Sequence, residues 1–332
     1  MASIYIYSPS SAVRDKAAFK RGVKRLKALG HDVDIDEAAL AKHMRFAGDD
    51  AVRIGSIGRA AASGADIALI TRGGYGLTRI LPAIHYKAIA KSIERGTQWV
   101  GISDFTALQS ALLVKTGAIS WAGPALGEDF GCANHGSAEL AAVAEPDDIM
   151  EACFDDLLQG IGEGTGWRMP KEPVPKGLTD TKHSVAAYAN NQRAGKPLSI
   201  QSATLWGGNL NVLTALLGTP YLPQIDKGIL FFEDVGEHPY RVERMLTSWL
   251  HAGILQRQRA IVLGQFTNFK LVPGYDSGFG MPSVVQWLRA QTKTPILIGL
   301  PFGHVPTKVC LPVGAKVSLN TEGRDALLFW GN

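Results

Sequence analysis

The first third of the chain alternates short apolar strand patterns with amphipathic helix patterns, and this alternation restricts the fold more than any other feature. Strand-like runs occupy residues 2–7, 67–70 and 99–102, and apolar residues at helical spacing occupy 12–29 and 49–62. Strands that alternate with helices form a parallel sheet covered by helices on both faces. Because ligands bind such sheets at the carboxyl ends of the strands, functional residues are expected where each strand pattern stops.

The length and a change of composition predict two domains. The chain has 332 residues, of which 46% are hydrophobic, and this is enough for ordinary cores. Glycine and proline become frequent from residue 160, and strand patterns resume near residue 197. We therefore predict an N-terminal α/β domain over 1–160, a linker or crossover over 161–195 and a C-terminal domain over 196–332.

The C-terminal segment is expected to be rich in β-strands. Short strand patterns recur along it, for example at 200–205 and 228–232. The runs 316–319 and 326–329 flank a polar turn and predict a hairpin.

Charge, hydropathy and cysteine content argue against several classes of partner. The net charge of +4 is scattered without a basic block, so no nucleic-acid partner is expected. No run approaches the roughly 18 apolar residues of a membrane helix, and the N-terminus lacks a signal pattern, so no membrane partner is expected. Cys132, Cys153 and Cys310 show no metal-ligand spacing, and there is no His-Glu-x-x-His motif. We predict no metal, no cofactor and a cytoplasmic location.

Ser103 follows the strand pattern at 99–102 and precedes a helix pattern that begins near Thr106. A serine at a sharp strand-to-helix turn projects its hydroxyl into the ligand cleft, close to the first amides of the helix, which can stabilise an oxyanion. The order of strand, serine and helix is that of a nucleophile elbow, although Phe105 stands where the Gly-x-Ser-x-Gly motif has its last glycine. The alternative role of Ser103 is that of a helix N-cap.

A glycine loop, Arg72 to Gly76, follows the strand pattern at 67–70. Its glycines allow backbone amides to approach a ligand, which suits the second donor of an oxyanion hole. The loop does not match a dinucleotide motif, because Arg79 occupies the position of the third glycine. The alternative is a tight turn that only joins a strand to a helix.

A carboxylate and a histidine follow two strand patterns in the C-terminal segment. Glu233 ends the apolar run 228–232, where burial of a carboxylate without a partner would be costly. Asp234 and Glu237 compete for the same role, and strand alternation allows only one of Glu233 and Asp234 to face a cleft. His304 lies in a turn that glycine and proline make rigid.

A serine, a carboxylate and a histidine in these positions favour a serine-hydrolase triad over other chemistries. A lone histidine is more often structural until a partner is shown. Four further histidines could serve, namely His85, His183, His238 and His251.

Taken in order, these segments resemble the serine peptidase family of LD-carboxypeptidases, which includes muramoyltetrapeptide carboxypeptidases and microcin-immunity peptidases. The motifs that carry the resemblance are Tyr7–Ser10, Arg72–Gly76, Gly101–Asp104, Gly207–Leu210, Phe232–Glu237 and Gly299–His304. The resemblance covers nearly the whole chain. It implies an N-terminal flavodoxin-like parallel-sheet domain, a C-terminal β-rich α/β domain, an active site at their junction and a homodimer.

The resemblance also implies catalytic roles. Ser103 would be the nucleophile, His304 the general base and Glu233 the residue that orients the histidine. The oxyanion hole would combine the Asp104 amide with a glycine amide of the loop.

Two further assignments remain open at this point. Gly74 and Gly76 are the candidates for the second amide of the oxyanion hole. Arg72 and Arg241 are candidates for binding the terminal carboxylate of a substrate, on charge and location alone.

The implied reaction releases terminal D-alanine from murein tetrapeptide, so the expected partner is that tetrapeptide or a related small peptide. An alternative within the family is cleavage of aminoacyl-nucleotide amides, in which Trp167 or Trp206 would contact the base. An alternative of another class is a binding module that holds a peptide or sugar without catalysis.

Overall fold

The computed structural model describes residues 1–132, 146–171 and 197–331. They form two compact units, each with its own sheet. Unit 1 comprises Met1–Gly162, Gly218–Pro223 and Pro306–Gly314, and unit 2 comprises the intervening residues and the C-terminus. Residues 172–195 of the predicted linker lie outside the described residues, as does His183.

Unit 1 is a doubly wound α/β unit. Its elements in chain order are β1 (Ser3–Tyr7), α1 (Lys16–Ala28), β2 (Asp32–Ile35), α2 (Asp50–Ala62), β3 (Ile67–Ile70), α3 (Leu77–Ile80), α4 (Tyr86–Glu94), β4 (Gln98–Gly101), α5 (Phe105–Thr116), β5 (Ser120–Ala122), α6 (Asp148–Gln159) and β11 (Leu311–Val313). The strands lie in the order β11-β5-β4-β3-β1-β2. Each pair from β2 to β5 is parallel.

Helices cover both faces of this sheet because successive side chains of β1 point to opposite sides. Ile4 and Ile6 belong to a core that also contains Phe19 of α1. On the other face the Tyr7 ring contacts Trp99, with ring centroids 5.4 Å apart. The Trp99 indole donates a hydrogen bond to a serine of α4.

The sheet of unit 1 is not entirely parallel, which differs from the expectation. β11 comes from near the end of the chain and pairs antiparallel with β5, so that Leu311 lies opposite Ala122. A strand this short and this distant in sequence from its partner carries no local signal of the pairing.

Unit 2 is rich in strands. Its elements are β6 (Gly164–Arg168), β7 (Ser199–Asn209), α8 (Leu210–Thr214), β8 (Ile229–Val235), α9 (Pro239–His251), β9 (Ala260–Thr267), α10 (Met281–Gln291), β10 (Ile296–Ile298), β12 (Lys316–Glu322) and β13 (Asp325–Phe329). The strand order is β10-β9-β8-β7-β12-β13-β6. The strands from β7 to β10 are parallel, and β12 and β13 form the predicted hairpin.

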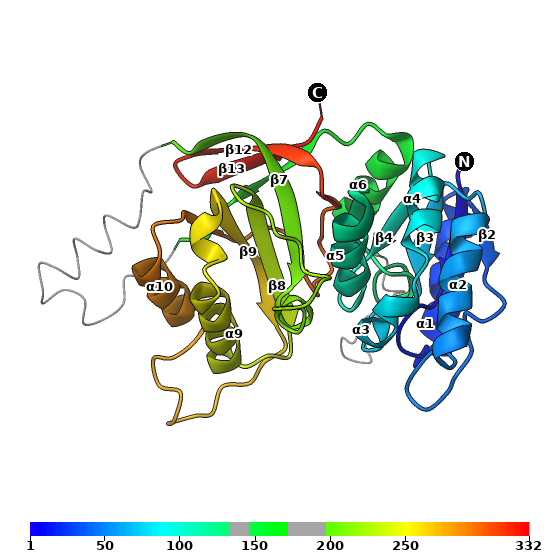
Figure 1. The fold of residues 1–332 in the computed structure, drawn as a ribbon, viewed down its shortest axis with the longest axis horizontal. Helices are drawn as coiled ribbons and strands as arrows, with labels where there is room; N and C mark the ends of the chain where they lie inside the picture. The colour runs from blue at the N-terminus through cyan, green and yellow to red at the C-terminus, as the bar shows by residue number, and fades with distance from the viewer. Residues whose placement is uncertain (133–145, 172–196, 332) are drawn as a thin grey trace, which may run out of the picture. The chain divides into compact units, whose positions relative to one another are not determined.

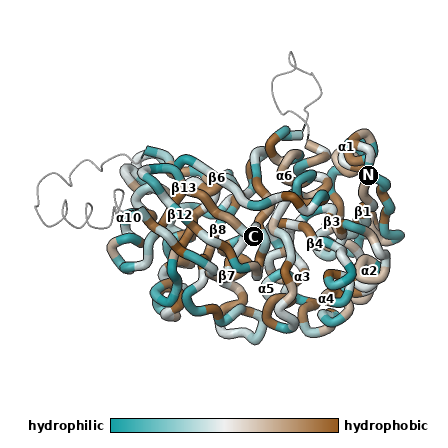
Figure 2. Tube along the Cα trace, turned by 90° about the horizontal axis from the view of Figure 1, so that it is seen from above, coloured by the Kyte–Doolittle hydropathy of each residue, from teal (hydrophilic) through white to brown (hydrophobic). Residues whose placement is uncertain are grey.

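The helices α9 and α10 lie beside each other on one face of the parallel strands of unit 2 (Figure 1). The Trp249 ring of α9 packs against Phe232 of β8, with ring centroids 5.0 Å apart. Hydrophobic stretches, brown in Figure 2, recur along the strands of each unit. The two-part α/β fold class is confirmed.

Candidate active site

Ser103 lies in a strained turn between β4 and α5. Its φ angle is +66°, in the left-handed region that costs a residue with a side chain about 1–2 kcal/mol. The helix N-cap is Asp104 rather than Ser103, and it makes no side-chain capping bond. Within the described part of unit 1 the Ser103 hydroxyl has no hydrogen-bond partner, so neither capping nor a local bond accounts for the strain.

Gly73 is the glycine that approaches Ser103 most closely. A Cβ atom on Gly73 would contact the Ser103 Cβ, lie 2.7 Å from its Oγ and lie 3.2 Å from the Asp104 amide nitrogen. A Cβ on Gly74 would instead meet Ser11, and one on Gly76 would meet Arg53. Only a residue without a side chain fits beside the serine, and Gly74 and Gly76 stay predictions as amide donors.

The Asp104 side chain links the turn that carries Ser103 to the segments of Ser10 and Leu77. Its buried carboxylate accepts hydrogen bonds from the Ser10 hydroxyl and, at 2.9 Å, from the Leu77 amide. Burial raises the pKa of the Asp104 carboxyl, and the bond from Ser10 opposes this shift. Arg53, which is fully buried, donates to the Gly76 carbonyl at 2.7 Å and so holds the far end of the glycine loop.

Arg72 is largely buried beside this loop. Its Nη1 atom is buried without a hydrogen-bond partner among the described residues, while its Nη2 lies 3.5 Å from Glu128. The Nη1 donors therefore have no acceptor among the described residues.

The second group of predicted residues lies in unit 2. His304 Nδ1 lies 2.8 Å from Glu233 Oε2, and the Glu233 side chain is fully buried. A carboxylate at Nδ1 fixes the imidazole tautomer with a proton on that nitrogen and leaves Nε2 as the basic atom. The structure thus pairs the carboxylate and the histidine that the sequence singled out.

Asn209 contacts the carboxylate of this pair, and the sequence reasoning assigned it no role. Its Nδ2 donates at 3.1 Å both to Glu233 Oε1 and to Asp234 Oδ1, and its Oδ1 accepts from the Val212 amide. The backbone bond fixes which way the amide faces, so the NH₂ group is directed at the carboxylates. The Gly-Gly-Asn run at the end of β7 was the available signal.

A shift in strand register accompanies the approach of the neighbouring carboxylates to the same amide. The register of β8 with β9 shifts between Phe232 and Asp234, so Glu233 lies at the irregularity. Irregularities of this kind, such as a β-bulge, change the direction of a side chain and break strict alternation. The assumption that Glu233 and Asp234 must face opposite sides therefore fails locally.

Asp234 is buried beside the Glu233 charge. Burial and this charge raise the pKa of Asp234 from 3.8 to about 7. Its carboxylate also accepts hydrogen bonds from the Val235 and Asn211 amides, each at 2.8 Å. Asp234 is therefore occupied in fixing the start of α8.

Glu237 and His238, the alternatives for the carboxylate and the histidine, contact other partners. Glu237 accepts from Asn211 at 2.9 Å and from Arg241 at 3.2 Å, and Arg241 is half exposed on the surface of α9. His238 Nε2 lies 3.0 Å from Asp276. The carboxylate that contacts His304 is Glu233.

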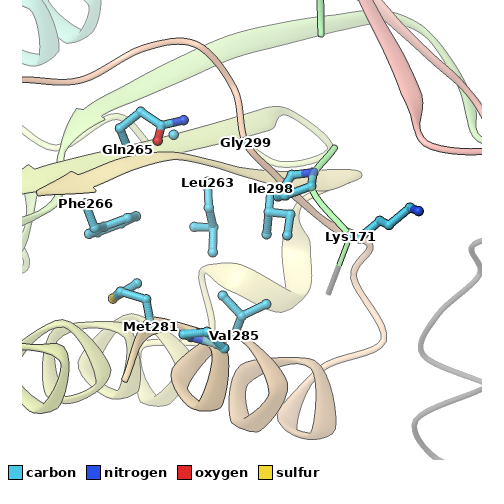
Figure 3. A pocket seen from close by; sticks show the side chains of 11 residues that line it. Lys171, Leu263, Gln265, Phe266, Met281, Val285, Ile298 and Gly299 are labelled. Carbon is cyan, nitrogen blue, oxygen red and sulfur yellow. The ribbon is translucent and has the colours of Figure 1, made fainter. Parts of the chain in front are cut away.

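A cavity of about 290 Å³ lies in unit 2 between α10 and the strands β9 and β10. In Figure 3 the side chains of Leu263, Met281, Val285 and Ile298 point toward one another across it, whereas the Lys171 side chain points away. The cavity is lined mainly by apolar groups. It can receive a small apolar group.

Ser103, Asp104 and the glycine loop belong to unit 1, and Glu233, Asn209 and His304 belong to unit 2. In the described ranges no group of three or more His, Cys, Asp or Glu residues could hold a metal ion. No described helix is long and apolar enough to cross a membrane.

Comparisons with known proteins identify the class. Residues 4–123 match the LD-carboxypeptidase N-terminal domain, and residues 202–319 match the LD-carboxypeptidase C-terminal domain. Together these matches cover most of the chain and include all the residues of both groups above. The chain belongs to the LD-carboxypeptidase family.

Three similar proteins illustrate the range of the family. The crystal structure of muramoyltetrapeptide carboxypeptidase from Oxalobacter formigenes matches with a TM-score of 0.79 and 35% identity, covering 99% of each chain. A probable murein peptide carboxypeptidase of Bacillus subtilis is 27% identical over 91% of this chain and 84% of its own. The microcin C7 self-immunity protein MccF of Escherichia coli is 26% identical over 77% of this chain and 71% of its own.

Proposed function

We propose that this protein is a serine-type LD-carboxypeptidase that releases the terminal D-alanine of murein tetrapeptide. The observation that carries the proposal is the buried Glu233 carboxylate at 2.8 Å from His304 Nδ1. A buried acid–histidine pair is the arrangement that prepares an imidazole to accept a proton from a nucleophile. The similarity to carboxypeptidases named for murein peptides supports this substrate.

In the proposed mechanism Ser103 attacks the carbonyl carbon of the scissile bond while His304 Nε2 takes the hydroxyl proton. The Asp104 amide and a glycine amide of the 73–76 loop stabilise the oxyanion of the tetrahedral intermediate. His304 then gives its proton to the leaving D-alanine nitrogen, and an acyl-enzyme remains on Ser103. Water, deprotonated by His304, attacks the ester and releases the shortened peptide and the free serine.

The Glu233 carboxylate stabilises the imidazolium that forms in each step, and Asn209 holds that carboxylate in position. A glutamate serves this role as well as an aspartate, because it only fixes the tautomer and stabilises the positive charge. Arg72 remains our candidate for the substrate's terminal carboxylate, because its Nη1 is buried without a described partner. Arg241 is the weaker candidate, since Glu237 already occupies it. A cytoplasmic homodimer stays a prediction.

The test is an assay of D-alanine release from disaccharide tetrapeptide, with the Ser103→Ala variant alongside. We expect release by the wild type and a loss of roughly 10⁴- to 10⁶-fold in kcat for the variant, with its unfolding free energy retained. Full activity of Ser103→Ala would refute the mechanism.

The similarity to MccF supports a second candidate, cleavage of an aminoacyl-nucleotide amide by the same residues. Trp206 and Trp167, which we considered for base stacking, are 1% and 9% exposed and donate hydrogen bonds within unit 2. Buried indoles offer little face to a nucleobase, which weakens this candidate. Amino acid release from an aminoacyl sulfamoyl adenosine, with none from the tetrapeptide, would establish it instead.

A further inference from the structure

A hollow of about 620 Å³ in unit 1 is lined by basic side chains. We call it the basic hollow and define it by Ser11, Arg14, Lys16, Lys42 and Arg45. The remaining lining residues are apolar, and no carboxylate is among them. The four cations are exposed, so their charges are available to a ligand.

The cations of the basic hollow have no ion-pair partner among the described residues, although the exposed Asp15 carboxylate lies between Arg14 and Lys16 in the sequence and contacts Arg21. In the part of the chain that the structure describes, none of the four cations forms an ion pair, and the Arg45 guanidinium lies 5.6 Å from the centre of the Tyr75 ring. Like charges around a concave surface repel one another and together raise the local positive potential. A bound anion would relieve this repulsion.

The position of the basic hollow in the fold matches a ligand site. Residues 11–16 follow β1 and residues 42–45 follow β2, so both segments lie at the carboxyl ends of neighbouring strands. The strand order reverses between β1 and β3, where open α/β sheets bind ligands, so the segment after β1 places one side of the hollow next to that point.

The glycine loop connects the basic hollow with Ser103. The Ser11 hydroxyl accepts a hydrogen bond from the Tyr75 amide at 3.0 Å. A Cβ on Gly74 would contact Ser11, and a Cβ on the preceding Gly73 would contact Ser103. Since neighbouring Cα atoms are about 3.8 Å apart, roughly two or three residues of an extended peptide could reach from Ser103 to the hollow.

Arg72 adds a cation along the same path. Its Nη1 atom would lie 3.0 Å from a Cβ on Gly74, and this atom is buried without a partner among the described residues. The space beside the glycine loop therefore carries positive charge from Arg72 to the basic hollow.

We propose that the basic hollow binds a carboxylate of an acidic peptide substrate, at a residue remote from the bond that Ser103 attacks. This inference rests on the proposed peptidase function and adds a charge requirement to its substrate. Four cations spread over separate loops suit carboxylates spaced along a peptide. A single phosphate is more often held by free backbone amides at a helix N-terminus, whereas at the start of α1, beside the hollow, the Asp15 carboxylate already accepts hydrogen bonds from the Ala17 and Ala18 amides.

The test compares murein tetrapeptide with an analogue in which every carboxylate except the C-terminal one is a carboxamide. We expect the wild type to prefer the acidic peptide by about tenfold in kcat/KM, the effect of two exposed ion pairs. The double variant Arg14→Gln/Lys42→Gln should bring this ratio close to one. Lys24→Gln, which removes an exposed lysine of α1 outside the hollow, should keep the wild-type ratio.

Equal kcat/KM values for both peptides in the wild type would overturn the inference and leave the peptidase function intact. Calorimetry of both peptides with the Ser103→Ala variant tests the opposite case, in which the hollow binds a carboxylate but the protein is not a peptidase. If neither peptide is hydrolysed but the acidic one binds more tightly, and Arg14→Gln/Lys42→Gln removes that difference, the inference stands and the proposed function fails. If both peptides bind equally while a nucleoside monophosphate binds and the double variant loses it, the hollow is a phosphate site and the inference is wrong.

Discussion

Ser103 and the Glu233–His304 pair are held in place by different means. Ser103 is positioned by backbone conformation, through a left-handed turn and a neighbouring glycine that leaves no space for a Cβ atom. Glu233 is positioned by buried polar contacts, with His304 on one carboxylate oxygen and Asn209 on the other. The first group depends on shape, and the second depends on charge.

This difference predicts different sensitivities. A turn held by sterics should not tolerate an added methyl group. A buried carboxylate network should tolerate little change of charge and should couple folding to pH. Each prediction below tests one side of this contrast, from the largest expected effect to the smallest.

Glu233→Gln should lower kcat by roughly 10³- to 10⁴-fold, because a neutral amide no longer stabilises the imidazolium and can favour the wrong tautomer. Glu237→Gln is the matched control and should change kcat by less than about tenfold, since Glu237 contacts Arg241 rather than His304. Steady-state kinetics on the tetrapeptide distinguish them. The opposite ranking would show that the orienting carboxylate is misassigned.

Gly73→Ala should lower kcat by about 100-fold or more, because the new methyl group displaces the Ser103 hydroxyl. The same clash should cost about 1–3 kcal/mol of unfolding free energy. Gly58→Ala in α2 is the control, since a Cβ there meets no atom within 4 Å. Kinetics and urea unfolding of both variants check this, and normal activity of Gly73→Ala would mean that sterics do not position the serine.

Asp234, buried beside Glu233, should make the unfolding free energy of the protein depend on pH. Its pKa of about 7 exceeds the ordinary value of 3.8, so the native protein keeps a proton that the unfolded chain releases. The stabilisation is complete below about pH 4 and is lost as the pH rises through about 7.

Asp234→Asn should therefore flatten the unfolding free energy between about pH 4 and pH 7, measured by urea titration at several pH values. Asp226→Asn, which removes an exposed carboxylate of the same unit, should retain the wild-type slope. A slope that Asp234→Asn leaves unaltered would contradict the raised pKa.

Ser103→Gly should be more stable than Ser103→Ala by about 0.5–1 kcal/mol, because glycine adopts a positive φ without strain. The greater conformational entropy of glycine in the unfolded chain offsets part of this stabilisation. Thermal or urea unfolding of the two inactive variants measures the difference. If alanine were the more stable replacement, the turn would not be strained.

Much of the fold could be predicted from local patterns. The expected strand at 67–70 is β3, and the expected helix at 49–62 is α2 with Asp49 as its cap. These predictions succeed because residues close in sequence decide helix caps and apolar periodicity. β11 escaped prediction, since its pairing partner lies nearly two hundred residues earlier in the chain.

The site was predictable in part for the same reason. Ser103 and His304 stand out because a strand or a rigid turn precedes each of them. Asn209 did not stand out, because its role depends on carboxylates 24 and 25 positions away. The direction of Glu233 likewise depends on the register shift between β8 and β9 rather than on its own segment.

The sequence by itself determined the fold class, the turn that carries Ser103 and the identity of the residue types available for catalysis, because these follow from local periodicity and turn chemistry. Only the tertiary structure decided that Glu233 rather than Glu237 contacts His304 and that Gly73 is the glycine against Ser103. It alone gathered Arg14 and Lys42 around one hollow. Hydrogen bonds, steric contact and electrostatic repulsion act over a few ångströms in space, and separation along the chain does not reveal those distances.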